Sequence, residues 1–134
     1  MLGIDHIGIA VHSIEKALPF YTDLLKFSYI KTEIVESQRV KVAFIDAVHC
    51  KIELLEPLDA ESPVYRFLQK RGEGIHHIAV KTDRIGERIK ELENKGVRMI
   101  DTVPRKGADG AEIAFLHPSS SFGVLWELCQ KTDQ

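Results

Sequence analysis

The chain has 134 residues, of which 44% are hydrophobic and 28% are charged, a balance typical of a single globular domain. Its formal net charge of -2 excludes the broad basic surface with which proteins bind nucleic acids or anionic membranes. Two cysteines are too few for a disulfide framework, and because the sequence shows neither a signal core nor a membrane span we expect a cytoplasmic protein.

The first half of the chain predicts a strand, a helix and three further strands. Residues 3–11 are apolar at nearly every position, as in a strand that is buried on at least one face. Ser13 is a candidate N-cap for the helix that follows, and Pro19 within its apolar stripe is expected to kink it. Further apolar patterns predict the remaining strands at residues 27–35, 39–47 and 50–56.

A linker at residues 59–73 leads into a second half with the same order of elements. Ser62 and Pro63 predict the start of a short linker helix, which Gly72 ends. The next strand begins at Ile75, and a helix is expected from Asp83 to Gly96. The last three strands are predicted at residues 97–103, 111–117 and 123–130.

The two halves match at a nearly constant spacing. His6–Ile9 lies over His77–Val80 at a spacing of 71 residues, and Ile52–Leu54 lies over Trp126–Leu128 at a spacing of 74. We interpret this match as an internal duplication. The expected fold is α+β, with two tandem βαβββ modules. The expected boundaries within a single domain of residues 1–134 are residues 1–58 for module one, 59–73 for the linker and 74–131 for module two.

Two histidines and two glutamates occupy equivalent positions of the repeat. His6 shares a strand face with small neighbours, as does His77, and this leaves room above the sheet. Glu53 and Glu127 each stand between apolar residues, where burial is costly unless the carboxylate is paired or bound to a metal. Two imidazoles and two carboxylates suit a divalent transition metal with positions left open for substrate. The alternative is a pair of core histidines with two glutamates that face solvent.

Paired βαβββ units with such residues on their first and last strands resemble the vicinal oxygen chelate superfamily, which includes glyoxalase I and the extradiol dioxygenases. Within it, the segments "IDHIGIAV", "KIELLEPL", "GIHHIAV" and "GVLWEL" are similar, in order, to the methylmalonyl-CoA epimerase family. The resemblance implies that the two modules form a curved mixed sheet around a metal site. It implies metal-ligand positions at His6, Glu53, His77 and Glu127. It implies a divalent ion such as cobalt, zinc, nickel or manganese.

The resemblance also implies an isomerase that interconverts 2R- and 2S-methylmalonyl-CoA through an enolate. Glu127 is the expected catalytic acid or base, and a homodimer acting on a small acyl-CoA is expected. The sequence departs from the family pattern where some relatives carry a second glutamate, because the aligned residue is Val42. Arg39 similarly stands where glycine is usual. The second acid–base residue is therefore unassigned.

Two other functions use the same scaffold. A glyoxalase I-type lyase, similar to lactoylglutathione lyase, uses a comparable ligand set, and a non-catalytic protein could hold a small ligand there. The segment at residues 56–74 and the "FLHP" ending favour the epimerase, and the sequence lacks a "DPDG" turn before Glu127. An iron oxygenase is disfavoured because such enzymes typically use two histidines and one carboxylate.

Overall fold

The computed structural model describes residues 2–131, which form two compact units. The first comprises residues 6–76 and is called here the 6–76 unit. The second comprises residue 77 onward together with the start of the chain up to Asp5, and is called the 77–131 unit. Each unit is described by itself.

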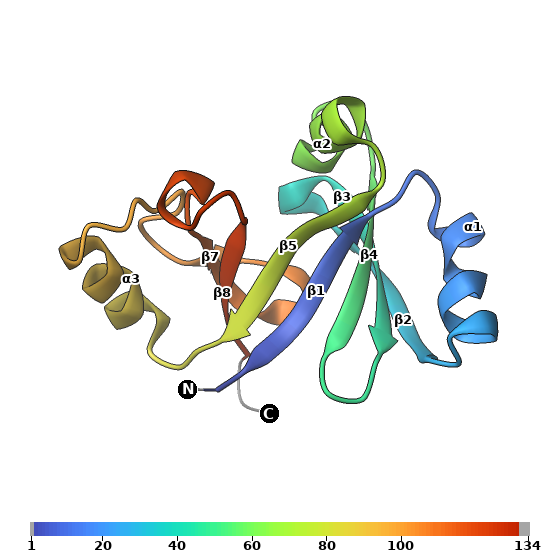
Figure 1. Cartoon of the computed structure of the whole chain (residues 1–134), viewed down its shortest axis with the longest axis horizontal. Coiled ribbons are helices and arrows are strands. Elements are labelled where there is room, and N and C mark those ends of the chain that lie inside the picture. Colours follow the sequence, from blue (N-terminus) through green and yellow to red (C-terminus); the bar gives the residue numbers. More distant parts are fainter. Residues whose placement is uncertain (1, 132–134) are drawn as a thin grey trace. The chain divides into compact units, whose positions relative to one another are not determined.

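The 6–76 unit contains four strands in the order β2-β3-β4-β1 (Figure 1). Strand β1 (Ile4–Ala10) pairs in parallel with β4 (Lys51–Pro57). Strand β3 (Val40–Asp46) pairs antiparallel with β4 and with β2 (Ser28–Val35). The first strand of the unit therefore lies edge to edge with its last strand.

A helical segment covers one face of this sheet. Helix α1 (Ile14–Pro19) begins at Ser13, whose hydroxyl accepts a hydrogen bond from the Lys16 N–H at 3.2 Å. At Pro19 the α-helical pattern ends and continues as one π-helical turn, η1 (Phe20–Leu24), because proline cannot donate the next backbone hydrogen bond. Ile14 of α1 packs in a buried cluster with Val11, Ala43, Ile45 and Leu54.

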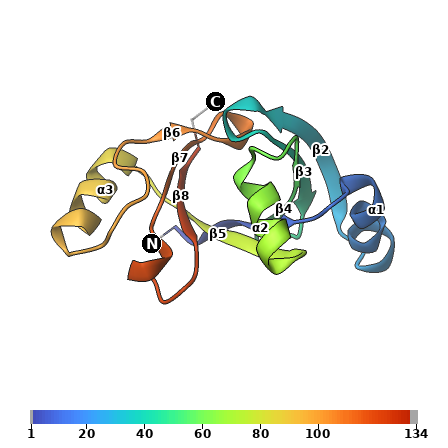
Figure 2. The same cartoon turned by 90° about the horizontal axis from the view of Figure 1, so that it is seen from above.

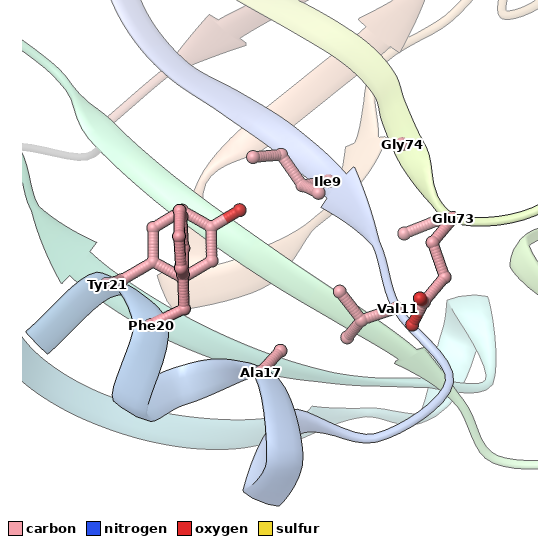
Figure 3. Close-up of a pocket in the computed structure, with 8 residues that line it drawn as sticks. Ile9, Val11, Ala17, Phe20, Tyr21, Glu73 and Gly74 are labelled. Carbon is pink, nitrogen blue, oxygen red and sulfur yellow. The ribbon is translucent and has the colours of Figure 1, made fainter. Parts of the chain in front are cut away.

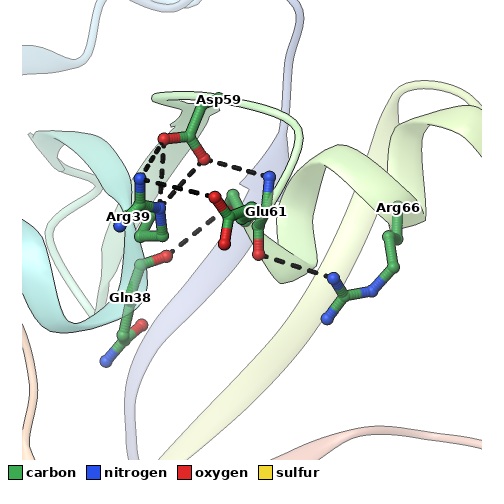
Figure 4. Close-up of polar contacts among 6 residues, drawn as sticks. Gln38, Arg39, Asp59, Glu61 and Arg66 are labelled. Atoms are coloured by element: carbon green, nitrogen blue, oxygen red, sulfur yellow. Dashed lines mark hydrogen bonds and ion pairs between the residues drawn. The ribbon is translucent and has the colours of Figure 1, made fainter.

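The connection from β4 to helix α2 (Pro63–Arg71) is tied to the turn before β3. The turn η2 (Glu36–Gln38) ends at Arg39, which adopts a left-handed backbone with φ of 50°. The Arg39 guanidinium donates to both carboxylate oxygens of Asp59, and the Asp59 carboxylate also accepts from the Glu61 N–H at 3.0 Å (Figure 4). These contacts hold the loop that presents Ser62, the N-cap of α2.

The 77–131 unit repeats the arrangement with shorter outer strands, in the order β5-β8-β7-β6 (Figure 2). Strand β5 (Gly74–Lys81) pairs in parallel with β8 (Trp126–Gln130). Strand β7 (Glu112–Phe115) pairs antiparallel with β8 and with the two-residue strand β6 (Arg105–Lys106). Short 3-10 turns, η3 (Ala108–Gly110) and η4 (Pro118–Ser120), connect them.

Helix α3 (Ile85–Asn94) covers one face of this unit, against Leu128 and Ala114. The two units anchor their helices in the same way. The Gln130 side chain accepts a hydrogen bond from the first helical N–H at Ile85, and Glu56 does the same for Ile14, both at 2.8 Å. The duplication thus extends to the helix N-termini.

The predicted α+β class and the order of strand, helix and three strands are confirmed, but some bounds are wrong. Helix α3 is capped by Arg84 instead of beginning at Asp83, and residues 97–103 form no strand beyond an isolated bridge at Met99. Asp101 explains the interruption, because its carboxylate accepts the Phe115 N–H at 2.8 Å in place of a backbone carbonyl. Pro104 then follows with no N–H to donate.

Candidate active site

His6 and Glu53 form a buried pair in the 6–76 unit. Strand β1 carries the histidine and β4 carries the glutamate, and their exposures are only 4% and 3%. His6 Nδ1 lies 3.2 Å from Glu53 Oε2. Because Leu54 packs toward α1, Glu53 points to the opposite face of the sheet.

His77 and Glu127 form the corresponding pair in the 77–131 unit. Their exposures are 6% and 4%, and His77 Nε2 lies 3.0 Å from Glu127 Oε1. The next residue along β8, Leu128, packs toward α3, so that Glu127 also points away from its helix. The structure therefore pairs each predicted histidine with the glutamate of its own half.

The register of the strands shows that the two pairs are structurally equivalent. In the 6–76 unit Glu53 lies between Gly8 of β1 and Phe44 of β3. In the 77–131 unit Glu127 lies between Ala79 of β5 and Phe115 of β7 in the same order. Each carboxylate thus has a small residue on one side, which leaves space for the histidine ring, and a phenylalanine on the other.

The donor atoms of each pair fit a bound cation. Buried carboxylates are costly unless a positive charge or hydrogen bonds compensate them. Imidazole nitrogen and carboxylate oxygen both ligate divalent transition metals with bonds of about 2.1 Å, and in an octahedral shell neighbouring ligand atoms are then about 3 Å apart. The separations of 3.2 Å and 3.0 Å match that spacing, so each pair is compatible with a divalent metal ion.

A cation lies over the phenylalanine beside each glutamate, a feature that the sequence reasoning missed. Lys31 Nζ lies 5.3 Å from the centroid of the Phe44 ring, and the Arg105 guanidinium lies 5.6 Å from that of Phe115. In the sequence, Phe44 and Phe115 already align at the repeat spacing of 71 residues. The cations could have been found from the pairing of β2 with β3 and of β6 with β7. In the 77–131 unit Asp101 also pairs with Arg105 at 3.0 Å.

The other histidines have structural surroundings. His12 and His49 are exposed, and His117 Nδ1 accepts the Ser119 N–H at 3.0 Å as the cap of a turn. The His76 ring packs edge-on against Phe67 with centroids 4.9 Å apart. These surroundings differ from the buried histidine–carboxylate pairs that His6 and His77 form.

A separate cavity of about 290 Å³ lies on the α1 side of β1 (Figure 3). Phe20 and Tyr21 form one side and Glu73 the other, and burial together with the negative charge of Glu73 raises the pKa of Tyr21. The Glu73 carboxylate is engaged by the His12 N–H at 2.9 Å. None of the four predicted metal ligands lines this cavity, so it is distinct from the His6–Glu53 pair.

Comparisons with known proteins agree with this architecture. The family model described as the glyoxalase/bleomycin resistance protein/dioxygenase superfamily matches residues 5–115. The uncharacterized protein YqjC of Bacillus subtilis is 48% identical over 98% of this chain and 94% of its own length. In the residues described by the structure, no helix has the length and apolar character needed to span a membrane.

Two further relatives have described activities. The ethylmalonyl-CoA/methylmalonyl-CoA epimerase of Cereibacter sphaeroides is 36% identical, covering 97% of this chain and 99% of that protein. A variant of the methylmalonyl-CoA epimerase of Streptomyces coelicolor, solved with 2-nitronate-propionyl-CoA, is 37% identical, with a TM-score of 0.93 and 99% coverage of both chains. The chain belongs to the glyoxalase/bleomycin resistance protein/dioxygenase superfamily and, within it, to the methylmalonyl-CoA epimerase family.

Proposed function

We propose that this protein is a metal-dependent epimerase that interconverts 2R- and 2S-methylmalonyl-CoA. The observation that carries the proposal is the repeated buried pair, His6 with Glu53 and His77 with Glu127, at equivalent positions of the two units. Nearly full-length similarity to the Cereibacter sphaeroides and Streptomyces coelicolor epimerases supports the substrate.

We propose that His6, Glu53, His77 and Glu127 together hold one divalent ion, with cobalt, zinc, nickel and manganese as the candidates. A bound cation of this kind supplies positive charge that stabilises the oxygen of an enolate. The buried setting of each pair strengthens this effect, because competing water is excluded from the carboxylates.

The reaction is a proton exchange at the α-carbon of the acyl group. A carboxylate takes the α-proton, and the electron pair of the broken C–H bond moves into the thioester carbonyl to give an enolate. A new C–H bond then forms on the opposite face as an acid donates a proton, and the carbonyl is restored. We assign Glu127 as one of the two proton carriers, because it is the acidic residue expected beside the reacting carbon.

Proton NMR in deuterated water tests the proposal. The metal-loaded protein is mixed with 2R-methylmalonyl-CoA, and the metal-free protein is the control. We expect deuterium at the α-carbon and formation of the 2S epimer only with metal. If the loaded protein catalyses no exchange, the epimerase is excluded, and a hemithioacetal assay then tests the glyoxalase I-type lyase. Tight ligand binding without either activity indicates the non-catalytic binding protein.

The homodimer and the cytoplasmic location remain predictions. Sedimentation equilibrium of the purified protein tests the first, since a chain of 15.2 kDa doubles in mass on dimerisation. Fractionation of cells that express the protein tests the second.

A further inference from the structure

We propose that Arg105 on β6 binds the free carboxylate of the acyl substrate. This inference rests on the proposed function, because methylmalonyl-CoA carries a carboxylate on the same α-carbon that exchanges its proton. The residues that support it, Asp101, Phe115 and His77 together with Arg105, all belong to the 77–131 unit. Their contacts place a braced guanidinium one aromatic ring away from His77.

Strand register places Arg105 on the sheet face of this unit that carries Glu127. Arg105 pairs with Ile113 of β7, which pairs in turn with Cys129 of β8. Directly paired residues of neighbouring strands point to the same face, as do residues two apart along one strand, so Arg105 shares its face with Cys129 and Glu127. Leu128, which lies between those two residues, packs against α3 on the other face. Arg105 and Glu127 are therefore both on the face opposite α3.

One phenylalanine ring connects Arg105 to the proposed metal ligands. The guanidinium carbon of Arg105 lies 5.6 Å from the centroid of the Phe115 ring. The His77 ring packs edge-to-face against the same phenylalanine, with centroids 5.5 Å apart and an interplanar angle of 89°. His77 Nε2 in turn lies 3.0 Å from Glu127 Oε1. An anionic group at Arg105 is thus close to a substrate held at the His77–Glu127 pair.

Asp101 fixes the orientation of the Arg105 guanidinium. The Arg105 Nε–H donates to Asp101 Oδ1 at 3.0 Å, while Asp101 Oδ2 accepts the Phe115 N–H at 2.8 Å. A guanidinium has five N–H donors, and within residues 2–131 the side-chain hydrogen bond of Arg105 uses the one on Nε. The terminal Nη1 and Nη2 groups form the planar fork that binds a carboxylate through two parallel hydrogen bonds.

The burial of this pair suits an anion that arrives with the substrate. The Asp101 side chain is 14% exposed and the Arg105 side chain is 40% exposed, so that the brace is covered by protein while the guanidinium stays accessible. A charge-assisted hydrogen bond in such a partly desolvated position is stronger than one in open water. The arrangement is therefore that of a prepositioned anion-binding group.

The position of Arg105 favours the carboxylate over the phosphates of CoA. A guanidinium fork binds either anion. In methylmalonyl-CoA the carboxylate is attached to the reacting α-carbon, whereas the phosphates lie at the far end of the long pantetheine arm. A cation one ring away from His77 meets the acyl end of a substrate bound at the proposed metal ligands. Its charge also offsets the repulsion between the carboxylate and the negative charge that develops on the enolate.

Affinity measurements with three ligands test the assignment. Isothermal titration calorimetry compares methylmalonyl-CoA with propionyl-CoA, which lacks the carboxylate, and with free CoA, which lacks the acyl group. We expect Arg105→Gln to weaken the binding of methylmalonyl-CoA by about 10–100-fold, with unchanged metal content. Its affinities for the other two ligands should stay within about threefold of the wild type. Arg105→Lys keeps the charge but loses the fork, so its affinity for methylmalonyl-CoA should lie between those of Arg105→Gln and the wild type.

Lys106→Gln is the matched control. Lys106 is the other residue of β6 and carries the same charge, but side-chain alternation directs it to the opposite face. This variant should bind all three ligands as the wild type does. A selective loss of methylmalonyl-CoA binding equal to that of Arg105→Gln would show that charge alone matters, and would contradict the proposal.

Two results for Arg105→Gln overturn its role and leave the epimerase standing. The first is equal weakening for all three ligands, which indicates contact with the phosphates or a change in local structure. The second is an affinity for methylmalonyl-CoA within about threefold of the wild type. The epimerase itself is decided separately by α-proton exchange in the wild type. If that exchange is absent, the proposed function fails, and the affinities still decide whether Arg105 holds the carboxylate.

Discussion

The two units share their inner strands and differ in their outer ones. Around Glu53 and Glu127 the registers match residue for residue, with a small residue on one side and a phenylalanine on the other. The outer strand is eight residues long in the 6–76 unit and two residues long in the 77–131 unit. The proposed metal ligands thus have the same strand surroundings in both units, whereas the outer strands differ.

The divergence makes the outer parts of the two units unequal. Strand β2 pairs with β3 along most of its length, whereas β6 consists only of Arg105 and Lys106. The histidines also differ, since His6 approaches its glutamate through Nδ1 and His77 through Nε2. The following predictions test how far the equivalence of the two units extends.

Removal of either histidine should have the largest effect. His6→Ala and His77→Ala each remove an imidazole ligand, so metal affinity should fall by more than about 100-fold and activity should fall with it. Metal analysis after gel filtration, paired with the NMR assay, measures both quantities. If one variant keeps full metal and full activity, the two pairs do not serve the same function.

Glu127→Gln should separate metal binding from turnover. The amide keeps one oxygen ligand but cannot carry a proton, so kcat should fall by about 10²–10⁴ while part of the metal remains. Glu53→Gln is the matched variant in the other unit. Its kcat should fall less than that of Glu127→Gln if Glu53 acts only as a ligand. An equal fall of kcat in the two variants would contradict the assignment of proton transfer to Glu127 alone of the two.

Much of this comparison was predictable from the sequence. The nearly constant spacing located both histidines and both glutamates, because a duplicated strand keeps its side-chain alternation. The strand predicted at residues 97–103 failed because apolar periodicity does not reveal that Asp101 takes the Phe115 N–H.

Truncation of the two phenylalanines should show unequal stability. Phe44 is 1% exposed and Phe115 is 8% exposed, so Phe44→Ala should lose about 3–5 kcal/mol of unfolding free energy, and Phe115→Ala less. Urea unfolding of the two variants measures the difference. Equal or reversed losses would show that the stability contributed by the two phenylalanines does not follow their burial.

The Arg39–Asp59 contact should produce a small effect that depends on pH. The hydrogen bond from Arg39 is the main cause that lowers the pKa of Asp59. The contact therefore stabilises the fold above the ordinary aspartate pKa of 3.8, and this contribution is lost as the pH falls through the lower pKa of the folded state. The Tm difference between wild type and Asp59→Asn should shrink as the pH is lowered from 6 to about 3. A difference that stays constant would contradict the assignment.

The central claim is that one histidine–glutamate pair from each unit serves a single metal ion. X-ray absorption of the cobalt-loaded protein, combined with metal analysis, tests it most directly. We predict one cobalt per chain with two imidazole ligands, falling to one imidazole in any cobalt that His77→Ala retains. Two cobalt ions per chain, or a single imidazole in the wild type, would contradict the account.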